Sequence, residues 1–485
     1  MNCAAEAPRI GALNNRAVRA AASRTAKKTK FHSNVSDRLR RLTMSNTIEF
    51  FAPGSPEYLS ATTPDNSSAT ERPAFVVRPT TAAEVGLAVI EAARRGLEIV
   101  PQSTGHGAGG TIGDDTVICD TSALTELVID PERRTASAGA GLKWGEINAA
   151  AEKHGLLGLA GTSPTVSICG YTFGGGYGWL TRPHGAASSA LLSVEYVDGA
   201  GTVRLATEDA ADKVDRDALW AFRGAGGVGI ATRLEFELAE VPDLHAGYFL
   251  WPASELEKVV AAWESALPLV ADSVATSISI LHTPPAPSFP ENLRGVPVVH
   301  LAVASSEGEA GALPLLDAVR AASHPGVDTW GAADAAKLGT IHLDPPTAVP
   351  ALGDARWLGE QTPAIAHSIL SVAAEPETPL ALVEIRSFGN TAPTRPGAVT
   401  SVLGPYAVHA VGALVPTSSR ERIQAAFDKV RQAARTVDLG RSLGSWAEGS
   451  ESVPDALTAE DRGRLSQIAD AVDPERNIHR SRFLA

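Results

Sequence analysis

Residues 97–110 have the sequence LEIVPQSTGHGAGG, in which a short apolar run passes into a loop of small residues around one histidine. The run Leu97–Val100 predicts a strand, because Ile and Val favour extended backbone. Upstream, residues 81–84 (Thr-Ala-Ala-Glu) match a capping box and predict a helix that ends before Gly96. With another strand predicted at 75–79, this is a β–α–β unit, in which the two strands are normally parallel.

The rest of the chain mixes helices with antiparallel hairpins, so the predicted fold class is α+β. A hairpin is predicted around Asp198-Gly199-Ala200-Gly201, and alternating residues predict a strand at 230–238. Between about 245 and 430, apolar runs alternate with Ala-rich helical stretches. This pattern predicts a second domain in which helices cover an antiparallel sheet. The predicted strands include 298–304 and 380–385, and the helices include 310–322 and 420–434.

Composition and charge exclude several classes of protein. The 485 residues carry a net charge of −13, although residues 1–43 hold ten Lys and Arg against two acidic residues. An acidic body is a poor partner for nucleic acid, and no apolar run is long enough for a membrane span. Three cysteines (Cys3, Cys119 and Cys169) exclude a disulfide scaffold and a Cys-based zinc site, and we expect a reducing, cytoplasmic location.

The basic N-terminal segment has three interpretations. A secretory signal is the weakest, because the segment lacks a clean apolar core. Its Arg-, Ser- and Ala-rich composition is typical of a transit peptide. Alternatively the reading frame is over-extended, since the second methionine, Met44, precedes a globular-looking sequence. We favour a tail that is dispensable for the fold.

Two segments match the dinucleotide pattern G-x-G-x-x-G, Gly105/Gly107/Gly110 and Gly224/Gly226/Gly229. Each runs into a predicted strand, whereas a Rossmann site needs a helix there, so a Rossmann NAD site is rejected. Residues 103–110 could instead offer several backbone N–H groups to a phosphate, and the Gly174–Gly178 segment could approach a flat ligand closely. The alternative is that both are ordinary turns.

His106 lies between glycines that would leave its imidazole accessible to a bound molecule. A neutral imidazole is a nucleophile, although a lone loop histidine is more often simply solvated. The other eleven histidines show no comparable setting, and no spacing suggests a metal site.

Five segments in this order resemble the FAD-linked oxidoreductases of the vanillyl-alcohol-oxidase (PCMH) type. The likeness is strongest to the berberine-bridge-enzyme-like group and to the bacterial 6-hydroxy-D-nicotine oxidases. The segments are Arg78-Pro79, the Gly105-His106 loop, Thr162–Gly178, Trp220–Gly227 and Asp473–Asn477.

The resemblance implies a two-part PCMH-type FAD-binding domain and a substrate domain with an antiparallel sheet covered by helices. The expected boundaries are a disordered tail at 1–45, the FAD-binding domain at 46–240, the substrate domain at 241–435 and a C-terminal segment at 436–485 that returns to the FAD domain.

Carried over from the family, His106 is joined covalently to the flavin 8α-methyl group. A single linkage is expected, because Ser163 stands where some relatives attach FAD through a second, cysteine residue. The resemblance assigns further cofactor contacts to Gln102, Ser103, Thr104, Gly105, Gly107, Thr162, Ser163, Gly170, Gly174, Gly175, Gly176, Gly178 and Ile230.

Three positions depart from the family pattern: Gln102 replaces an arginine, Thr104 a glycine and Ser188 an aspartate. Losing the arginine predicts that FAD binding depends more on backbone donors and on the covalent bond. Cys169 is interpreted as a small packing residue, with a reactive thiol as the alternative.

The implied reaction is hydride transfer from a small organic substrate to flavin N5, with O2 as acceptor and no nucleic acid, membrane or metal partner. The alternatives are a dehydrogenase or secondary-metabolism tailoring enzyme that uses another acceptor, or a flavin-binding protein without turnover. We expect a monomer or homodimer. Glu384, Arg386 and Tyr406 are candidate catalytic residues, with Asn390 nearby, although the first two also fit a solvated cross-strand pair.

Overall fold

A small parallel sheet follows from the strand–helix–strand pattern before the glycine loop. The computed structural model describes residues 48–345, 347–375, 377–389 and 395–484, so the tail at 1–45 and Asn390 lie outside the described residues. Strands β2 (Phe75–Val77), β5 (Thr116–Asp120) and β3 (Glu98–Gln102) pair in that order, all parallel. Helix α3 (Ala82–Arg94) connects β2 to β3, and its N-cap Thr81 accepts a hydrogen bond from the Glu84 amide.

The second sheet is antiparallel and completes a first lobe, which we define as residues 48–240 together with 443–484. Its strand order is β10 (Val203–Thr207), β9 (Leu191–Val197), β11 (Ile230–Glu237), β7 (Thr135–Gly139) and β6 (Leu127–Asp130). β9 and β10 form the hairpin predicted around residues 198–201. The shorter elements of this lobe are α2 (Pro56–Ala61), β1 (Thr70–Glu71), β4 (Thr111–Ile112), α4 (Trp144–Ala151), β8 (Leu156–Leu157), α5 (Ile168–Thr172), α6 (Thr181–His184), α7 (Ala187–Ala190), α8 (Lys213–Phe222), β12 (Ala239–Glu240) and α14 (Ala459–Val472).

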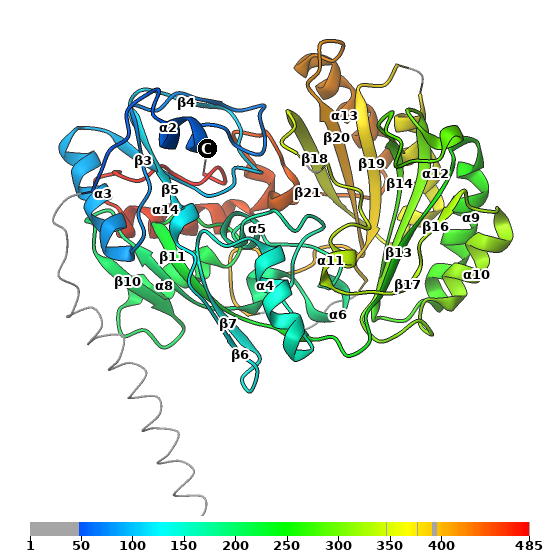
Figure 1. Ribbon diagram of the computed structural model, residues 1–485, viewed down its shortest axis with the longest axis horizontal. Helices are drawn as coiled ribbons and strands as arrows, with labels where there is room; N and C mark the ends of the chain where they lie inside the picture. The colour runs from blue at the N-terminus through cyan, green and yellow to red at the C-terminus, as the bar shows by residue number, and fades with distance from the viewer. Residues whose placement is uncertain (1–47, 346, 376, 390–394, 485) are drawn as a thin grey trace, which may run out of the picture. The chain divides into compact units, whose positions relative to one another are not determined.

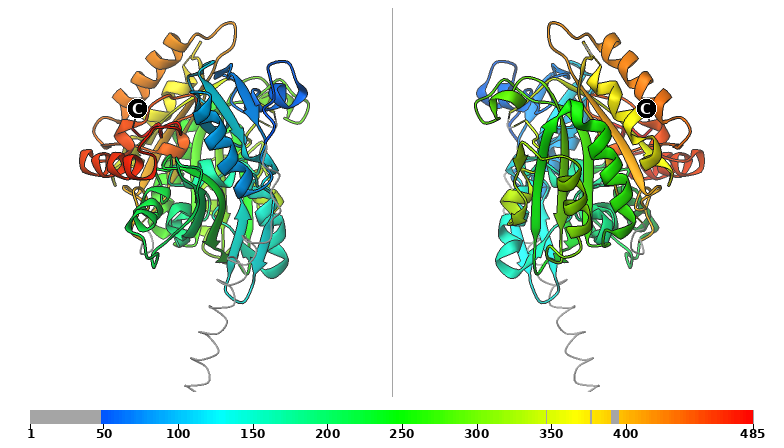
Figure 2. Two further views of the ribbon diagram at one scale, coloured as in Figure 1. Left: turned by 90° about the vertical axis from the view of Figure 1, so that its left-hand side faces the viewer. Right: turned by 90° about the vertical axis from the view of Figure 1, so that its right-hand side faces the viewer.

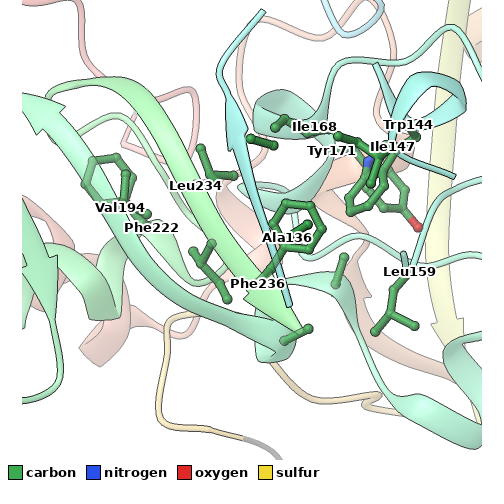
Figure 3. Packing of buried hydrophobic residues seen from close by; sticks show 14 of the residues in the cluster. Ala136, Trp144, Ile147, Leu159, Ile168, Tyr171, Val194, Phe222, Leu234 and Phe236 are labelled. Atoms are coloured by element: carbon green, nitrogen blue, oxygen red, sulfur yellow. The ribbon is translucent and has the colours of Figure 1, made fainter. Parts of the chain in front are cut away.

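An aromatic cluster between β11 and α4 forms the core of this lobe (Figure 3). Phe236 points inward from β11 and its ring lies 5.3 Å from that of Trp144. Trp144 and Ile147 share one face of α4 because they are three residues apart. Tyr171 of α5 packs edge-on against Trp144 at 5.9 Å, so this core fixes the position of α5 relative to α4.

The second lobe, residues 241–442, is built on one large antiparallel sheet, as the sequence predicts. In the described residues the sheet has nine strands: β13 (His245–Pro252), β14 (Val274–His282), β15 (Pro297–Ser305), β16 (Val327–Asp328), β17 (Gly331–Ala332), β18 (Ala351–Leu358), β19 (Leu380–Ser387), β20 (Tyr406–Ala413) and β21 (Asp438–Ser442). Its helices are α9 (Leu256–Ala266), α10 (Leu313–Ala322), α11 (Ala335–Leu338), α12 (Thr362–Ala374) and α13 (Arg420–Ala434). Figures 1 and 2 show α9, α10 and α12 on the side of the sheet away from the first lobe.

The alternation of side chains along β19 determines which of its residues face the first lobe. Val383 and Ile385 pack into the core under the helices. Glu384 and Arg386 therefore point to the opposite face, because successive strand residues alternate. Both are buried there, so the alternative of a solvated cross-strand pair is wrong.

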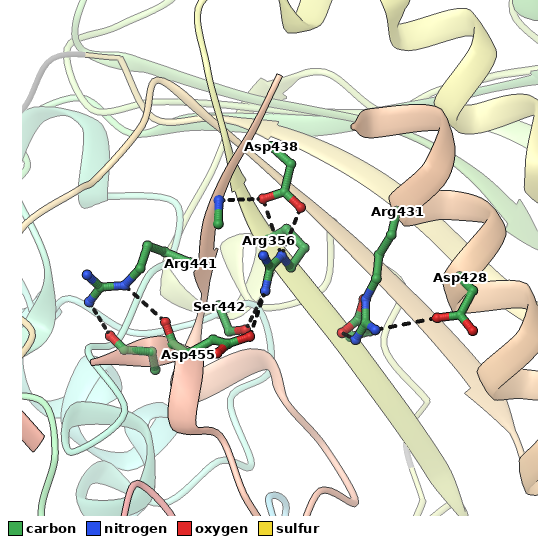
Figure 4. A network of polar contacts seen from close by, with 10 residues as sticks. Arg356, Asp428, Arg431, Asp438, Arg441, Ser442 and Asp455 are labelled. Atoms are coloured by element: carbon green, nitrogen blue, oxygen red, sulfur yellow. Dashed lines mark hydrogen bonds and ion pairs between the residues drawn. The ribbon is translucent and has the colours of Figure 1, made fainter. Parts of the chain in front are cut away.

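Ion pairs bind the edge strand β21 to the segment that leads back to the first lobe (Figure 4). Arg356 of β18 lies 3.1 Å from Asp438 and 3.3 Å from Asp455. Arg441 donates to the Asp455 and Ala456 carbonyls. Beyond this point α14 packs beside α8, in the same lobe as α3 and β3 (Figure 1).

The Asp473–Asn477 segment anchors the returning chain beside β3. Asp473 is 5% exposed and accepts hydrogen bonds from the Asn477 and Ile478 amides at 3.0 and 2.7 Å. The resulting turn places Asn477 and His479 so that they bond to the backbone of Ile99. This geometry gives a physical reason for the Asp473–Asn477 motif, one of the five segments that carry the family resemblance.

Asp473→Ala should therefore destabilise the protein. It leaves two amides without an acceptor, each at about 1–3 kcal/mol, so we expect the free energy of unfolding to fall by about 2–6 kcal/mol. Urea denaturation measures this change. Asp470→Ala, one turn earlier at the exposed Asp470–Arg480 pair, is the control and should change the unfolding midpoint little. Equal effects of the two substitutions would contradict this account of the turn.

Candidate functional site

The glycine-rich loop after β3 is half-exposed from Gln102 to His106 and again from Ala108 to Gly110. Gly105 has φ +68°, and a Cβ there would collide with the Pro64 side chain. A neighbouring segment supports the loop from behind, because the Asp65 amide donates to Thr104 O at 2.9 Å and the Asn66 amide to Gly105 O at 3.2 Å. The loop is therefore a fixed backbone surface with one open side.

His106 projects from this loop between two neutral hydroxyls and one carboxylate. Its Nδ1 lies 2.9 Å from Asp65 Oδ2 and 3.0 Å from Thr104 Oγ1, and its Nε2 lies 3.3 Å from Thr165 Oγ1. The side chain is 31% exposed, so the simply solvated alternative does not describe it. Burial lowers the pKa of His106 despite the opposing charge of Asp65, which favours the neutral ring.

The segment 161–170 lies across the imidazole from the glycine loop. Ser163 Oγ is 2.9 Å from Thr165 Oγ1, which in turn reaches His106. Gly170 is exposed, and a Cβ there would meet nothing within 4 Å. On the other side Ser103 Oγ is buried without a hydrogen-bond partner. Thr162, Ser163 and His106 are all half-exposed, so these three residues line the same open side of the loop.

Two other predicted contact residues have side chains that pack or bond within the protein. The Gln102 amide donates to Ala61 O and Glu71 Oε2, which uses its side chain in the scaffold. Ile230 is fully buried beside Val197 in β9. For these two residues and for Gly107, which is exposed, contact with a cofactor stays a prediction.

The glycines between 174 and 178 are buried against protein atoms. A Cβ at Gly174 would lie 2.8 Å from the Ser445 nitrogen, and one at Gly176 would lie 2.7 Å from Ala187 Cβ. Gly178 has Ala160 O in the place of a side chain, and Gly175 has φ +102°. Close packing alone thus explains these glycines, and their predicted contact with a flat ligand stays a prediction.

Arg482 is a residue that sequence reasoning missed. Its guanidinium donates to the carbonyls of Gly107, Ala447 and Gly444, and so fastens the glycine loop to the C-terminal segment. A cation therefore stands beside the loop although Gln102 replaces the usual arginine. No local signal marks Arg482, because only the folded chain brings it to the loop.

The second lobe contributes a chain of alternating charges that is buried except at Asp344, whose side chain is 29% exposed. Asp344 Oδ1 lies 2.7 Å from His342 Nδ1, and His342 Nε2 lies 2.8 Å from Glu384 Oε2. Glu384 Oε1 accepts from Arg386 Nε at 2.6 Å and from Ser277 Oγ at 2.7 Å. His342 was not singled out in the sequence analysis, although the pattern His342-x-Asp344 is a local signal that marks it.

The charges in this chain hold one another in the ionised state. Burial disfavours the charged form of His342, but the Asp344 and Glu384 carboxylates outweigh it and raise its pKa to about 10. Burial also opposes ionisation of the acids, yet His342 lowers the pKa of Asp344 to about 2. Arg386 and His342 hold the pKa of Glu384 well below its usual range. The four groups together have no net charge.

Arg386 ends the chain between two indole rings. Its guanidinium carbon lies 4.7 Å from the Trp179 ring centroid and 4.6 Å from that of Trp446. Arg386 Nη1 is buried without a partner, as are Trp179 Nε1 and the Tyr171 hydroxyl. Unpartnered buried donors are costly, so this group favours an incoming hydrogen-bond acceptor.

The structure separates Tyr406 from the other two catalytic candidates. Tyr406 packs against Trp263 of α9, with ring centroids 6.2 Å apart, on the helix-covered side of the sheet. Strand alternation causes this, since Tyr406 pairs with Ser387 and not with Arg386. Cys169 is partly buried against both neighbouring cores, and burial raises its thiol pKa to about 12, as befits a packing residue.

Two classes of site find no support in the part of the chain that the structure describes. No helix there combines the length and hydropathy needed to cross a bilayer. Nor do the described side chains gather three His, Cys, Asp or Glu residues in an arrangement suited to a metal ion.

Residues 73–207 match the FAD binding domain family. The chain is 32% identical over 215 residues to (R)-6-hydroxynicotine oxidase of Paenarthrobacter nicotinovorans, which covers 43% of this chain and 46% of that protein. It is 29% identical over 218 residues to berberine bridge enzyme-like 18 of Arabidopsis thaliana, covering 43% and 39%. The matched part thus spans less than half the length of these curated relatives.

A solved structure extends the likeness to nearly the whole fold. The structure of 6-hydroxy-D-nicotine oxidase from Arthrobacter nicotinovorans has a TM-score of 0.77 at 22% identity, covering 92% of this chain and 100% of that one. The resemblance inferred from the five sequence segments is confirmed, as is the predicted fold class. Residues 73–207 therefore form an FAD binding domain, within a chain that has the fold of the berberine-bridge-like and 6-hydroxy-D-nicotine oxidase structures.

Proposed function

We propose that this protein is an FAD-dependent oxidase that acts on a small organic substrate and holds its FAD covalently at His106. The setting of His106 supports this most directly. Its imidazole is partly exposed, is favoured in the neutral form and lies between the two loops of the FAD binding domain. A neutral imidazole with an open side is suited to forming such a bond.

The residues around His106 fit FAD. Ser103, Thr104, Gly105 and Gly107 would hold the diphosphate through backbone N–H groups, and the buried, unpartnered Ser103 hydroxyl provides a further donor. Thr162, Ser163 and Gly170 would lie on the other side of the ring system. Bound FAD would supply a two-electron acceptor for a hydride from the substrate, with O2 as the final acceptor.

On the substrate side we assign different roles to Glu384 and Arg386. Both Glu384 oxygens already accept hydrogen bonds and its pKa is low, so it is a poor proton acceptor. It instead positions Arg386, whose Nη1 has no partner. Arg386 and Trp179 present only donors and the Tyr171 hydroxyl can also donate, which suits a carbonyl or hydroxyl oxygen of the substrate.

An uncharged substrate fits this cluster better than an anion does. Asp344, His342, Glu384 and Arg386 already balance one another, so an added carboxylate would leave a net negative charge buried among them. The small-molecule oxidases among the relatives, such as xylooligosaccharide oxidase, are compatible with this class of substrate.

His106→Ala should abolish covalent flavin without emptying the site. After acid precipitation, flavin fluorescence should stay with the wild-type polypeptide but appear in the supernatant for the variant, because the other FAD contacts remain. The control is His479→Ala, which removes an exposed imidazole paired with Glu98 in the same lobe. Wild-type flavin that is released by acid would disprove the attachment. Peroxide release on a substrate panel separates an oxidase from a dehydrogenase.

The raised pKa of His342 predicts a specific pH dependence of stability. The charged ring stabilises the fold fully below its unfolded pKa of about 6.5, and this contribution disappears as the pH rises through about 10. The difference in unfolding free energy between wild type and His342→Gln should therefore shrink from pH 6.5 to 10. Urea titrations at several pH values measure it.

His300→Gln is the matched control for this experiment. His300 is a buried neighbour whose ring lies 6.4 Å from that of His342. Burial lowers its pKa to about 4, so it is neutral throughout the range above pH 7. His300→Gln should therefore lower the unfolding free energy by the same amount at every pH in that range. If the loss caused by His342→Gln were also independent of pH, the charged state of His342 would be contradicted.

A further inference from the structure

The position of Asp65 beside His106 has a consequence for how FAD becomes attached. We propose that Asp65 is the positioning residue for covalent attachment at His106: its carboxylate orients the imidazole and accepts the ring proton that bond formation releases. This inference rests on the proposed covalent attachment. It is carried by the 2.9 Å separation of Asp65 Oδ2 from His106 Nδ1.

The backbone fixes Asp65 from two sides. Its amide donates to Thr104 O at 2.9 Å, and its carbonyl accepts from the Val349 amide at 3.2 Å. The next residue, Asn66, is buried and bonds through its side chain to both the nitrogen and the carbonyl of Ala351. Asp65 is therefore held between the glycine loop and the chain entering β18, and its carboxylate needs no rearrangement to reach His106.

Among the groups around the His106 imidazole, Asp65 is the one suited to accept its proton. Thr104 and Thr165 offer neutral hydroxyls, which are far weaker bases than a carboxylate. Among the described residues Asp65 is the one carboxylate within ion-pair distance of the ring. Asp344 and Glu448 act on His106 only from further away and are paired with His342 and His409.

With Asp65 as the proton acceptor, the atoms and electrons of the attachment step balance. The imidazole N–H bond and one C–H bond of the flavin 8α-methyl group break, and one N–C bond forms. Both hydrogens leave as protons, one of them to Asp65, and the electron pair of the C–H bond passes to the isoalloxazine ring. Dioxygen, the acceptor in the proposed function, takes that pair back and leaves with two protons as hydrogen peroxide.

The test measures the rate at which FAD becomes acid-stable in the full-length protein. Asp65→Asn keeps the size and backbone contacts of the residue but cannot accept the proton. FAD should still bind and colour the protein, while acid-stable flavin should form about 10²-fold more slowly, the usual scale of lost general-base assistance. The readout is flavin in the acid pellet against flavin in the supernatant over time, and it does not depend on turnover.

A second variant distinguishes proton acceptance from simple support of the loop. Asp65→Ala leaves a gap that formate can enter, since the Asp65 side chain is 39% exposed, and added formate should restore the rate. Asp243→Asn is the matched control, because Asp243 lies 3.3 Å from His245 in the second lobe as another carboxylate–imidazole pair. It should attach FAD at the wild-type rate.

The outcomes separate this inference from the function on which it rests. An Asp65→Asn variant that attaches FAD as fast as wild type would overturn the role of Asp65 while leaving attachment at His106 intact. Slow attachment in Asp65→Ala that formate does not restore would also overturn it. Wild-type protein that never acquires acid-stable flavin would refute the covalent attachment and this inference with it.

Discussion

Burying His342, Glu384 and Arg386 together, with the partly exposed Asp344 at the end of their chain, imposes the strongest constraint on this structure. An isolated charge in such a place costs several kcal/mol, and only the alternation of signs makes the burial tolerable. Each group has its partner at 2.6–2.8 Å, so none can move alone. Arg386 is held by this chain against Trp179 of the first lobe and Trp446 of the returning segment. The charge chain of the second lobe is thus tied through Arg386 to the first lobe and to the returning segment.

Local sequence signals predicted much of the framework. Helix α13 spans Arg420–Ala434 as predicted, because Ser419 caps its first turn and its apolar residues recur at helical spacing. The two G-x-G-x-x-G segments lead into β4 and β11, as expected from the extended residues after them. The separation of the two faces of β19 likewise follows from simple alternation. The burial of Glu384 and Arg386 on one of these faces does not.

The site was only partly predictable, because its key contacts join distant segments. His106 was found from its glycine neighbours, a signal contained within eight residues. Asp65 reaches it from a loop that composition marks only as polar, and Arg482 comes from the other end of the chain. Tyr406 was misplaced for a different reason: no strand was predicted there, and the face on which its ring lies depends on register across the sheet.

The contact between Arg482 and the glycine loop has a consequence for the order of events in the cell. The carbonyl of Gly107 acquires its guanidinium partner from a residue that leaves the ribosome long after the loop itself. Ser481, which bonds to Ala225 O, emerges equally late. A nascent chain that has reached only the second lobe lacks both of these contacts. The glycine loop therefore reaches the arrangement seen in the folded chain only after this last segment has been translated.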